Sequence, residues 1–345
     1  MSTDVIGVEV LRAWPGGVAH VESRHAVRVA VVDATGRPLF ARGDVGAAVF
    51  PRSAIKLIQA LPLVESGAAD ALALTTAELA LASASHNGEE AHVATARAML
   101  ARVGRDETCL ACGPQWPERE SDRGRLQRAD ARPTRLHNNC SGKHAGFVCF
   151  ACHAGLDPAG YEAPDHPVQR EIAAALSDVA GVDLAAAPMG RDGCSIPTWA
   201  LPLAAVAGAM ARLGTGEGLA PTRAAAARRL LDAARAEPFM IAGTNRFCTD
   251  FAEAIDRTAY VKTGAEGVFA AILPSLGLGV AVKAEDGAAR AAQVAVGEVV
   301  ACLLGRADDP ALARFLRPVL KDWNGVEVGG LRLAAGALAG LAPPA

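Results

Sequence analysis

One stretch organises the chain, the ten residues Pro51-Arg52-Ser53-Ala54-Ile55-Lys56-Leu57-Ile58-Gln59-Ala60. It predicts the start of a helix, because Pro51 suits a first helical turn, where its missing N–H would have had no partner. Pro62 removes a backbone donor and crowds the preceding turn, so we expect the helix to kink or stop near it. The apolar side chains between the two prolines recur at helical spacing and form one stripe: Ile55, Ile58 and Leu61.

The same stretch carries two side chains that can react together. Ser53 and Lys56 are three residues apart, so they lie on one face of the expected helix. A serine hydroxyl becomes a good nucleophile when a base takes its proton, and a buried, neutral lysine amine can be that base. The N–H groups at a helix N-terminus also lie near the place where an oxyanion forms. We therefore predict Ser53 as nucleophile and Lys56 as base, against the alternative of a solvated helix face.

Lysine is rare in this sequence, which has five lysines among 34 basic residues. Arginine cannot give up its proton and so cannot act as a neutral amine. Three of the five lysines stand in short motifs with Ser, Thr or Cys, which favours a chemical role for them: Lys56, Lys143 and Lys262.

The composition describes a globular chain with a sizeable core. It has 345 residues, of which 51% are hydrophobic and 21% are charged. β-rich runs gather at both ends and helical runs fill the middle, which predicts an α/β fold with a central sheet built from both chain ends. We expect a single domain over residues 1–345, with a sheet lobe at about 1–50 and 255–345 and a helical lobe at about 51–254.

The charge and the N-terminal sequence narrow the class of protein. A net charge of −3 argues against nucleic acid as a main partner. Residues 1–17 contain Asp4 and Glu9 and lack the apolar run of a signal peptide, and the apolar runs 199–211 and 268–282 are too short or too broken to span a membrane. We therefore expect a soluble, cytoplasmic protein, in which the eight cysteines are thiols or metal ligands.

A hairpin and two later strands are expected to share one sheet. Residues 26–33 and 38–40 flank a turn at 34–37, and residues 260–262, 268–273 and 278–282 give further strands. The segments 109–132 and 190–197 are expected to be loops. Helices are predicted over seven other segments: 72–81, 89–103, about 141–155, 167–179, 199–213, 222–236 and 288–304.

Three short motifs follow one another along the chain: Ser53-x-x-Lys56, Ser85-His86-Asn87 and Lys262-Thr263-Gly264. Motifs of the types Ser-x-x-Lys, Ser-Asp-Asn and Lys-Thr-Gly, in that order, are typical of serine β-lactamases and penicillin-binding proteins. The chemistry is acyl transfer, with a second Ser/Lys pair that carries the proton to the leaving nitrogen. The alternatives are a helix cap or turn for Ser85 and Asn87, and an exposed edge-strand lysine for Lys262.

A second constellation suggests a metal site. Cys140-x-x-Lys143 is followed by His144, and Cys194 stands in a glycine-containing loop after Asp192. Two thiolates with a nitrogen donor and an open position suit zinc. The alternatives are buried apolar cysteines and a turn aspartate. Two Cys-x-x-Cys pairs also occur, Cys109/Cys112 without an assignable role and Cys149/Cys152 inside an apolar run that favours core packing.

Together these motifs make the chain resemble a known family, the rhizobial-type L-asparaginases (asparaginase II), a zinc-containing class with Ser-Lys pairs. The resemblance spans residues 21 to about 290 and rests on these stretches: Val21-Glu22-Ser23-Arg24-His25, Arg52-Ser53-Ala54-Ile55-Lys56, Gln59-Ala60-Leu61-Pro62, Ser83-Ala84-Ser85-His86-Asn87-Gly88, His137-Asn138-Asn139-Cys140-Ser141-Gly142-Lys143-His144, Asp192-Gly193-Cys194-x-x-Pro197 and Lys262-Thr263-Gly264.

The resemblance implies a serine β-lactamase-like or glutaminase-like fold, a homodimer, and hydrolysis of L-asparagine to L-aspartate and ammonia. It implies Ser53 with Lys56 as the first catalytic pair and Ser85 with Lys262 as the second. It implies zinc on Cys140, Lys143 and Cys194. The expected substrate-binding residues are Arg52, Asn87, Asp192 and His144. The chain departs from the family pattern at Ser195-Ile196, where smaller residues are expected.

Two other functions remain open at this point. A serine glutaminase or a β-lactam-reacting hydrolase would use the same chemistry. A cytosolic zinc-binding sensor would need only the cysteines and would make the Ser/Lys motifs accidental. Ammonia release from asparagine and from glutamine, measured side by side, separates these functions.

Overall fold

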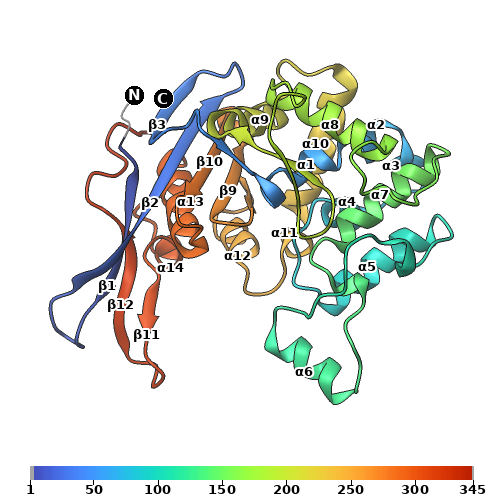
Figure 1. Cartoon of the computed structure of the whole chain (residues 1–345). Helices are drawn as coiled ribbons and strands as arrows, with labels where there is room; N and C mark the ends of the chain where they lie inside the picture. The colour runs from blue at the N-terminus through green and yellow to red at the C-terminus, as the bar shows by residue number, and fades with distance from the viewer. Residues whose placement is uncertain (1–3, 344–345) are drawn as a thin grey trace. The chain divides into compact units, whose positions relative to one another are not determined.

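The structure, a computed structural model, describes residues 4–343 (Figure 1). It is a mixed α/β structure, and the chain divides into two compact units. The first unit contains the residues up to Ala54, Leu201–Thr215 and the residues from Phe251 onward, and the second contains Ile55–Ala200 and Gly216–Asp250. The description of the whole chain as one domain stays a prediction.

An eight-stranded sheet forms the first unit, with neighbours in the order β11-β12-β1-β2-β10-β9-β8 and β3 paired with β2. All of its strand pairs are antiparallel. The strands are β1 (Ile6–Arg12), β2 (His20–Asp33), β3 (Pro38–Arg42), β8 (Tyr260–Thr263), β9 (Val268–Leu273), β10 (Leu278–Ala284), β11 (Val319–Lys321) and β12 (Glu327–Leu333).

The predicted sharing of one sheet by both chain ends is confirmed. β2 pairs with β10 along seven positions, with Val31 opposite Val280. The turn between β2 and β3 forms as its sequence predicts, because the Asp33 carboxylate accepts from the N–H groups of Thr35 and Arg37. Gly36 supplies the positive φ of +86° that this turn needs.

Two helices cover β9 and β10, which explains why both strands are almost wholly apolar and buried. They are α9 (Leu203–Thr215) and α13 (Ala289–Leu303), and Figure 1 shows α13 against the strands. Gly279 allows α9 to approach, because a Cβ there would lie 1.9 Å from the carbonyl oxygen of Ala207. Smaller elements complete the unit: β4 (Ala48–Val49) paired with β7 (Leu201–Pro202), η4 (Pro274–Leu276), η5 (Pro310–Leu312) and α14 (Ala313–Leu316), while η1 (Arg52–Ile55) crosses the boundary of the two units.

The α9 region differs from the sequence expectation. The predicted helix over 199–213 begins at Leu203, because the residues before it are extended and a residue that precedes proline avoids the helical region. The segment 201–215 also belongs to the unit of the sheet, although the sequence analysis assigned it to the helical lobe.

Helices form most of the second unit. Their bounds are α1 (Lys56–Gln59), α2 (Leu61–Glu65), α3 (Ala68–Ala71), α4 (Thr76–Leu81), α5 (Glu90–Ala101), η2 (Glu107–Cys109), α6 (Glu120–Arg128), η3 (Arg135–His137), α7 (Ser141–His153), α8 (Pro167–Ala180), α10 (Pro221–Ala236) and α11 (Pro238–Ile241), while α12 (Phe247–Ala254) crosses the boundary of the two units. A short hairpin of β5 (Met189–Arg191) and β6 (Pro197–Trp199) accompanies them.

The expected interruption near Pro62 is confirmed. The turn η1 leads into α1, which ends at Gln59, and α2 starts at Leu61 with Pro62 in its first turn. The start of α4 is also fixed locally, because Thr75 and Glu78 form a capping box. The helix expected over 72–81 therefore occupies only Thr76–Leu81.

Two segments expected to be loops contain regular structure. Within 109–132, α6 forms with Glu120 and Asp122 in its first turn and Arg125 and Arg128 in its last, which is the charge order that favours a helix. It has no buried side chain, so the apolar periodicity that reveals a helix in sequence is missing. The segment 190–197 is mostly the turn of the β5–β6 hairpin, which Cys194 occupies.

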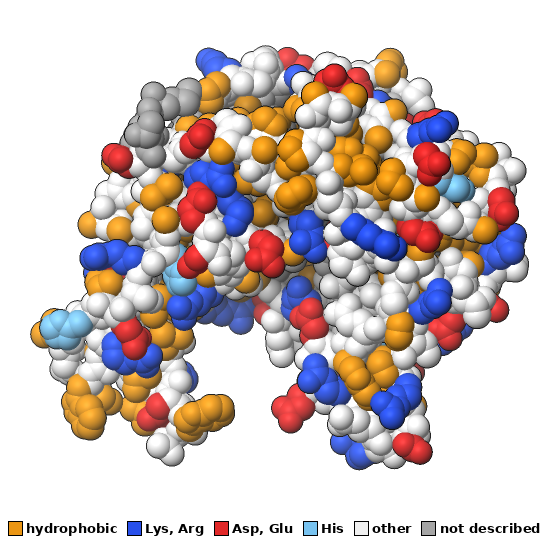
Figure 2. Space-filling view, in the orientation of Figure 1, with side chains coloured by type: hydrophobic (Ala, Val, Ile, Leu, Met, Phe, Trp, Pro, Cys, Tyr) orange, Lys and Arg blue, Asp and Glu red, His pale blue; other side chains and the backbone are white. Residues whose placement is uncertain are grey.

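The surface carries both signs of charge. Figure 2 shows Lys and Arg side chains interspersed with Asp and Glu on the viewed face. Among residues 4–343, no helix is both long enough and apolar enough to cross a membrane.

Candidate active site

Lys56 lies at the start of α1 and is fully buried, with a relative exposure of 0%. Its Nζ donates to the Oγ of Ser85 at 2.8 Å, to the Sγ of Cys140 at 3.1 Å and to the carbonyl oxygen of Ala84. The contact with Ser85 is notable, because the sequence analysis paired Lys56 with Ser53 and paired Ser85 with Lys262. The structure thus brings one lysine of the first motif to the serine of the second.

The Ser85-His86-Asn87 motif forms an extended strap between two other segments. The N–H groups of Ser85 and Asn87 donate to the carbonyls of Ile241 and Ala242, while the N–H of His86 donates to Asn139 on the other side. This alternation is that of a strand, in which successive residues point to opposite sides. The strap therefore holds Ser85 beside the segment that ends in Cys140.

The predicted metal ligands come together in the second unit. Lys143 and Cys140 lie at the start of α7, and the Nζ of Lys143 donates to the Sγ of Cys194 at 3.0 Å. Cys140 and Cys194 also lie close enough for each to shift the pKa of the other. With Lys56 against Cys140, the cluster contains two buried amines and two buried thiols.

Burial and mutual charge set the protonation of this cluster. Burial lowers the pKa of Lys56, which favours the neutral amine. The neighbouring Cys194 thiol and the nearby amines hold the pKa of Cys140 well below its usual value, which favours its thiolate form. The neighbouring Cys140 sulfur and burial raise the pKa of Cys194. Burial alone would lower the pKa of Lys143, but the two neighbouring sulfurs outweigh it and raise that pKa.

The cluster offers zinc two thiol donors, Cys140 and Cys194, and one amine donor, Lys143. Among residues 4–343, no group of three or more His, Cys, Asp or Glu side chains is placed to hold a metal ion. The two convergent thiols therefore need the Lys143 amine as a third donor. Two soft sulfurs and one nitrogen, with a fourth position open, match a catalytic type of zinc site. To bind zinc, the Lys143 amine would have to lose a proton, although the neighbouring sulfurs raise its pKa and favour the ammonium form.

The side chain of Asn87, a predicted substrate-binding residue, is hydrogen-bonded to three groups of the protein. Its Nδ2 donates to Glu89 at 3.1 Å and to the Thr244 carbonyl at 3.0 Å, and its Oδ1 accepts from Arg246 at 2.8 Å. Glu89 also accepts from Arg119, the residue that precedes α6. The assignment of Asn87 to substrate binding stays a prediction.

His144 and Asp192 flank the same cluster. The Nδ1 of His144 lies 2.5 Å from the Tyr161 hydroxyl, and its Nε2 is buried without a hydrogen-bond partner among residues 4–343. Asp192 is partly exposed, accepts from the N–H of Gly193 at 2.6 Å, and lies close enough to Lys143 to help raise its pKa.

In the first unit, the third motif lies against the segment that leads to Ser53. Lys262 is fully buried at the end of β8, and its Nζ donates to the Thr263 carbonyl. A Cβ at Gly264 would lie 2.6 Å from the Pro51 carbonyl oxygen, so the backbones nearly touch there. Arg52 has a φ of +51°, an unfavourable value for a side chain with a Cβ. Ser53 follows it in a half-buried position.

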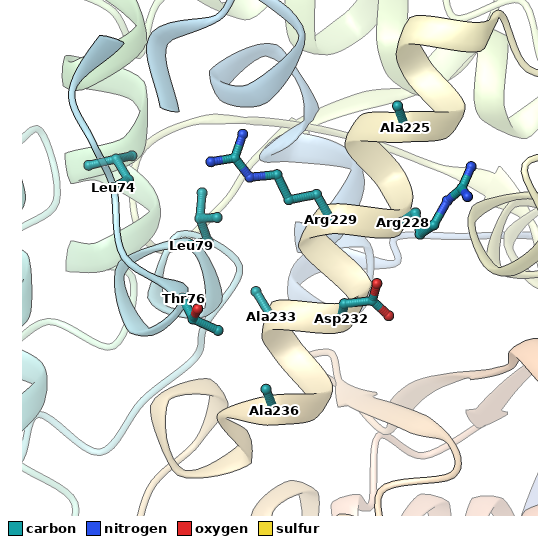
Figure 3. Close-up of a pocket in the computed structure, with 9 residues that line it drawn as sticks. All are labelled: Leu74, Thr76, Leu79, Ala225, Arg228, Arg229, Asp232, Ala233 and Ala236. Carbon is teal, nitrogen blue, oxygen red and sulfur yellow. The ribbon is translucent and has the colours of Figure 1, made fainter. Parts of the chain in front are cut away.

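A hollow lies elsewhere in the second unit. It measures about 660 Å³ and is formed by α10 and the region of α4 (Figure 3). Figure 3 shows Arg229 extending from α10 across it, and Arg229 pairs with Asp70 at 2.7 Å. None of its lining residues belongs to the motifs above, so its size does not make it the candidate site.

Sequence reasoning missed several residues that shape this site. His86 and Ser141 bond to each other behind Ser85 and Cys140, and Glu89 and Arg246 hold Asn87. His86 was within a recognised motif, yet a histidine between two polar residues carries no signal of burial. Arg246 is distant in sequence from its partner, so only the fold reveals the contact.

Comparison with known proteins decides the family. A family model described as L-asparaginase II matches residues 8–333. The chain belongs to the L-asparaginase II family. Membership of the L-asparaginase II family confirms the expected class of enzyme, a hydrolase of the L-asparaginase type, and implies a small-molecule substrate. The finer expectations of zinc, Ser-Lys chemistry and a homodimer lie beyond this match.

Two further comparisons add little to the family match. No curated protein matches this L-asparaginase II family member. One solved structure, titled "Crystal structure of Mglu in its native form in the presence of 4.3M NaCl", matches with 16% sequence identity and a TM-score of 0.33. The match covers 75% of this chain and 56% of that chain, and a similarity this low carries no argument.

Proposed function

We propose that this chain hydrolyses L-asparagine to L-aspartate and ammonia through a serine nucleophile that a buried lysine activates. The observation that carries the proposal is Lys56, fully buried, with a pKa lowered by burial and its amine 2.8 Å from the Ser85 hydroxyl. A neutral lysine amine is a base, so Lys56 can take the proton of the proposed nucleophile Ser53, three residues before it in the sequence, and pass it to the adjacent Ser85.

In the first half of the reaction, the Ser53 oxygen forms a bond to the side-chain amide carbon of asparagine. Lys56, three residues further along the chain, takes the hydroxyl proton. The proton then passes through Ser85 to the amide nitrogen, the C–N bond breaks, and ammonia leaves. Lys262 serves as the second lysine, which assists Ser85 in this transfer.

In the second half, water attacks the aspartyl ester at the same carbon. Lys56 accepts a proton from that water and returns it to the Ser53 oxygen as the ester bond breaks. The products are L-aspartate and the original enzyme. Arg52, Asn87, Asp192 and His144 are proposed to bind the substrate.

Zinc is proposed on Cys140, Lys143 and Cys194, the donor set that converges in the second unit. Bound there, zinc would supply a Lewis acid that attracts a carbonyl or carboxylate oxygen of the substrate. The chain's own residues set the cost of loading, because Lys143 must be neutral to donate its electron pair and its neighbours favour the ammonium. A serine β-lactamase-like or glutaminase-like fold, a homodimer and a cytoplasmic location also belong to this proposal.

Ammonia release tests the function and its alternatives together. The wild-type enzyme is assayed with L-asparagine, with L-glutamine and with a chromogenic β-lactam, beside Ser53→Ala. We expect release from asparagine well above release from glutamine, no β-lactam turnover, and a loss of at least about a thousand-fold in kcat for Ser53→Ala.

Faster release from glutamine would favour the serine glutaminase, and β-lactam turnover would favour the other acyl-transfer alternative. A wild-type protein that binds zinc and turns over none of the three compounds would support the sensor. A Ser53→Ala enzyme with a rate near wild type would overturn Ser53 as the nucleophile.

A further inference from the structure

We propose that His86 is a positioning residue, which fixes Ser85 relative to Cys140 and thereby places the atoms that surround the Lys56 amine. The inference deepens the proposed function and rests on it, because it concerns the lysine that acts there as base. The two ring nitrogens of His86 bond to Ser141 and Gly88 and not to Ser53 or Ser85. Any effect of His86 on the reaction therefore passes through other groups.

The acceptors around Lys56 come from two different segments. Ser85 belongs to the strap and Ala84 immediately precedes it, while Cys140 immediately precedes α7. The geometry of the amine therefore depends on how the strap lies against the start of α7. Catalytic groups displaced by about 1 Å can cost on the order of a hundred-fold in rate, so the relative position of these two segments matters.

His86 connects the two segments twice. Its backbone N–H donates to the Asn139 carbonyl at 3.1 Å. Its side-chain Nε2 lies 3.0 Å from the Ser141 Oγ, and the Ser141 hydroxyl donates onward to the Leu136 carbonyl at 2.8 Å. One residue thus bonds to the chain on both sides of Cys140.

The hydrogen bonds define which nitrogen of His86 carries the proton. Nδ1 accepts from the N–H of Gly88 at 3.1 Å, so it is unprotonated. The Ser141 hydroxyl has its own hydrogen directed to Leu136, so Nε2 must be the donor in that contact. The imidazole is neutral, and both of its nitrogens have a partner.

A stack of rings keeps this imidazole in place. His86 lies on His92, with ring centres 4.8 Å apart and 12° between the planes, and His92 lies on Phe239 at 4.7 Å and 17°. His92 has the same pattern of bonds, because its Nδ1 accepts from the N–H of Glu89 and its Nε2 donates to the Phe239 carbonyl. His92 is therefore a matched control, which is equally buried in the stack but bonded away from Ser141.

Two substitutions separate the two nitrogens of His86. His86→Gln places an amide donor near the position of Nε2, and His86→Asn places an amide acceptor near the position of Nδ1. We expect His86→Asn to lower kcat at least ten-fold with KM changed less than three-fold, and His86→Gln to recover kcat to within about three-fold of wild type. Ser141→Ala should resemble His86→Asn, and the double variant His86→Asn/Ser141→Ala should be no worse than either single one.

His92→Gln controls for damage to the stack. We expect His92→Gln to lower Tm about as much as the His86 variants do, while kcat of the folded enzyme stays within about three-fold of wild type. Losses of kcat that follow Tm across all these variants, or additive losses in the double variant, would overturn the positioning role. A wild-type enzyme without asparaginase activity would overturn the proposed function instead.

A second measurement tests the bridge without substrate. The ¹⁵N NMR signals of the imidazoles, assigned by their loss in His86→Gln, should show His86 as the Nε2–H form, and the Nε2 signal should move in Ser141→Ala. An Nδ1–H form, or an Nε2 signal that is unchanged in Ser141→Ala, would overturn the inference whatever the activity of the enzyme.

Discussion

Lys56 shows how a single residue acquires its chemistry from burial. An exposed lysine is an ammonium at neutral pH, with a pKa of about 10.4. Here the side chain is fully buried, which lowers the pKa, while the Cys140 thiolate partly restores it. The outcome is an amine that exchanges its proton more easily than a surface lysine and that already lies at hydrogen-bond distance from a serine hydroxyl.

The substitution Lys56→Arg tests whether this side chain must give up a proton. Arginine keeps the positive charge and many of the contacts but cannot be deprotonated. We expect kcat to fall at least about a thousand-fold, and Lys321→Arg, at an exposed position, to leave kcat unchanged. A Lys56→Arg enzyme with a tenth or more of wild-type kcat would mean that Lys56 acts only as a charge.

The two thiols of the cluster make a prediction about metal content. Cys140→Ser and Cys194→Ser each remove one of three proposed zinc donors, so we expect loss of bound zinc and a KM raised at least five-fold, with a smaller effect on Tm. Cys149→Ala is the control, because Cys149 is equally buried but donates to the Met99 carbonyl. Elemental analysis beside kinetics measures both effects. Stoichiometric zinc in both serine variants, or none in the wild type purified without chelator, would mean that these cysteines are not ligands.

At the scale of elements, the end of β8 depends on a glycine. Gly264 has no Cβ, and this lets the strand approach the Pro51 carbonyl just before Ser53. Its φ is not in the left-handed region, so a substitution there meets only the crowding.

We therefore expect Gly264→Ala to push apart the two backbones of the first unit and to lower kcat at least ten-fold. Gly113→Ala is the control, because a Cβ at Gly113 would meet no atom within 4 Å. Equal activity of the two alanine variants, measured as kcat of folded protein, would show that the close approach has no catalytic consequence.

The buried histidines make the second unit sensitive to acid. Burial lowers the pKa of His86, His92 and His144, so the folded chain resists protonation. The unfolded chain accepts those protons near the ordinary pKa of about 6.5. Stability is therefore complete above that value and is lost as the pH falls below it, by up to about 1.4 kcal/mol per pH unit for each histidine that stays neutral.

Urea unfolding between pH 8 and pH 5 measures this loss, above the range in which carboxylates are protonated. We expect the free energy of unfolding to fall more steeply with decreasing pH once the pH is below about 6.5, with a shallower fall in His92→Gln. The exposed His20 serves as the control, because His20→Gln should keep the wild-type slope. A free energy of unfolding that does not change from pH 7 to pH 5 would contradict the account of these histidines.

At the scale of the whole molecule, the sequence predicted what local patterns determine. The hairpin, the later strands and the break at Pro62 follow from alternation and from proline chemistry, and they were found. Lys143 donates to Cys194 in the structure, while the zinc site that the resemblance implies on Cys140, Lys143 and Cys194 stays a prediction. Helix α6 was missed because it buries nothing. The apolar alternation of Ile6, Val8 and Val10 in β1 was overlooked, whereas β11 has only three residues and β12 contains the pair Gly329-Gly330, so both give a weak strand signal.

The site residues that sequence reasoning missed share one property, which is that their role depends on distant partners. His86 matters because Ser141 lies beside it, and Asn87 is oriented by Arg246, far along the chain. The contact of Lys56 with Ser85 is of the same kind, because only the fold brings the first two motifs together. The spacing of residues within a short motif does not show which distant residues the fold brings into contact with it.

The central claim is that this chain forms an acyl-enzyme on Ser53, and one measurement tests it most directly. Wild-type enzyme is mixed with L-asparagine, quenched in acid within milliseconds, and digested for mass spectrometry. The account predicts an aspartyl group esterified to Ser53, absent from Ser53→Ala and formed far more slowly in Lys56→Arg than in wild type. Ammonia release with no aspartyl adduct in the quenched wild type, or with the adduct on Ser85 alone, would contradict it.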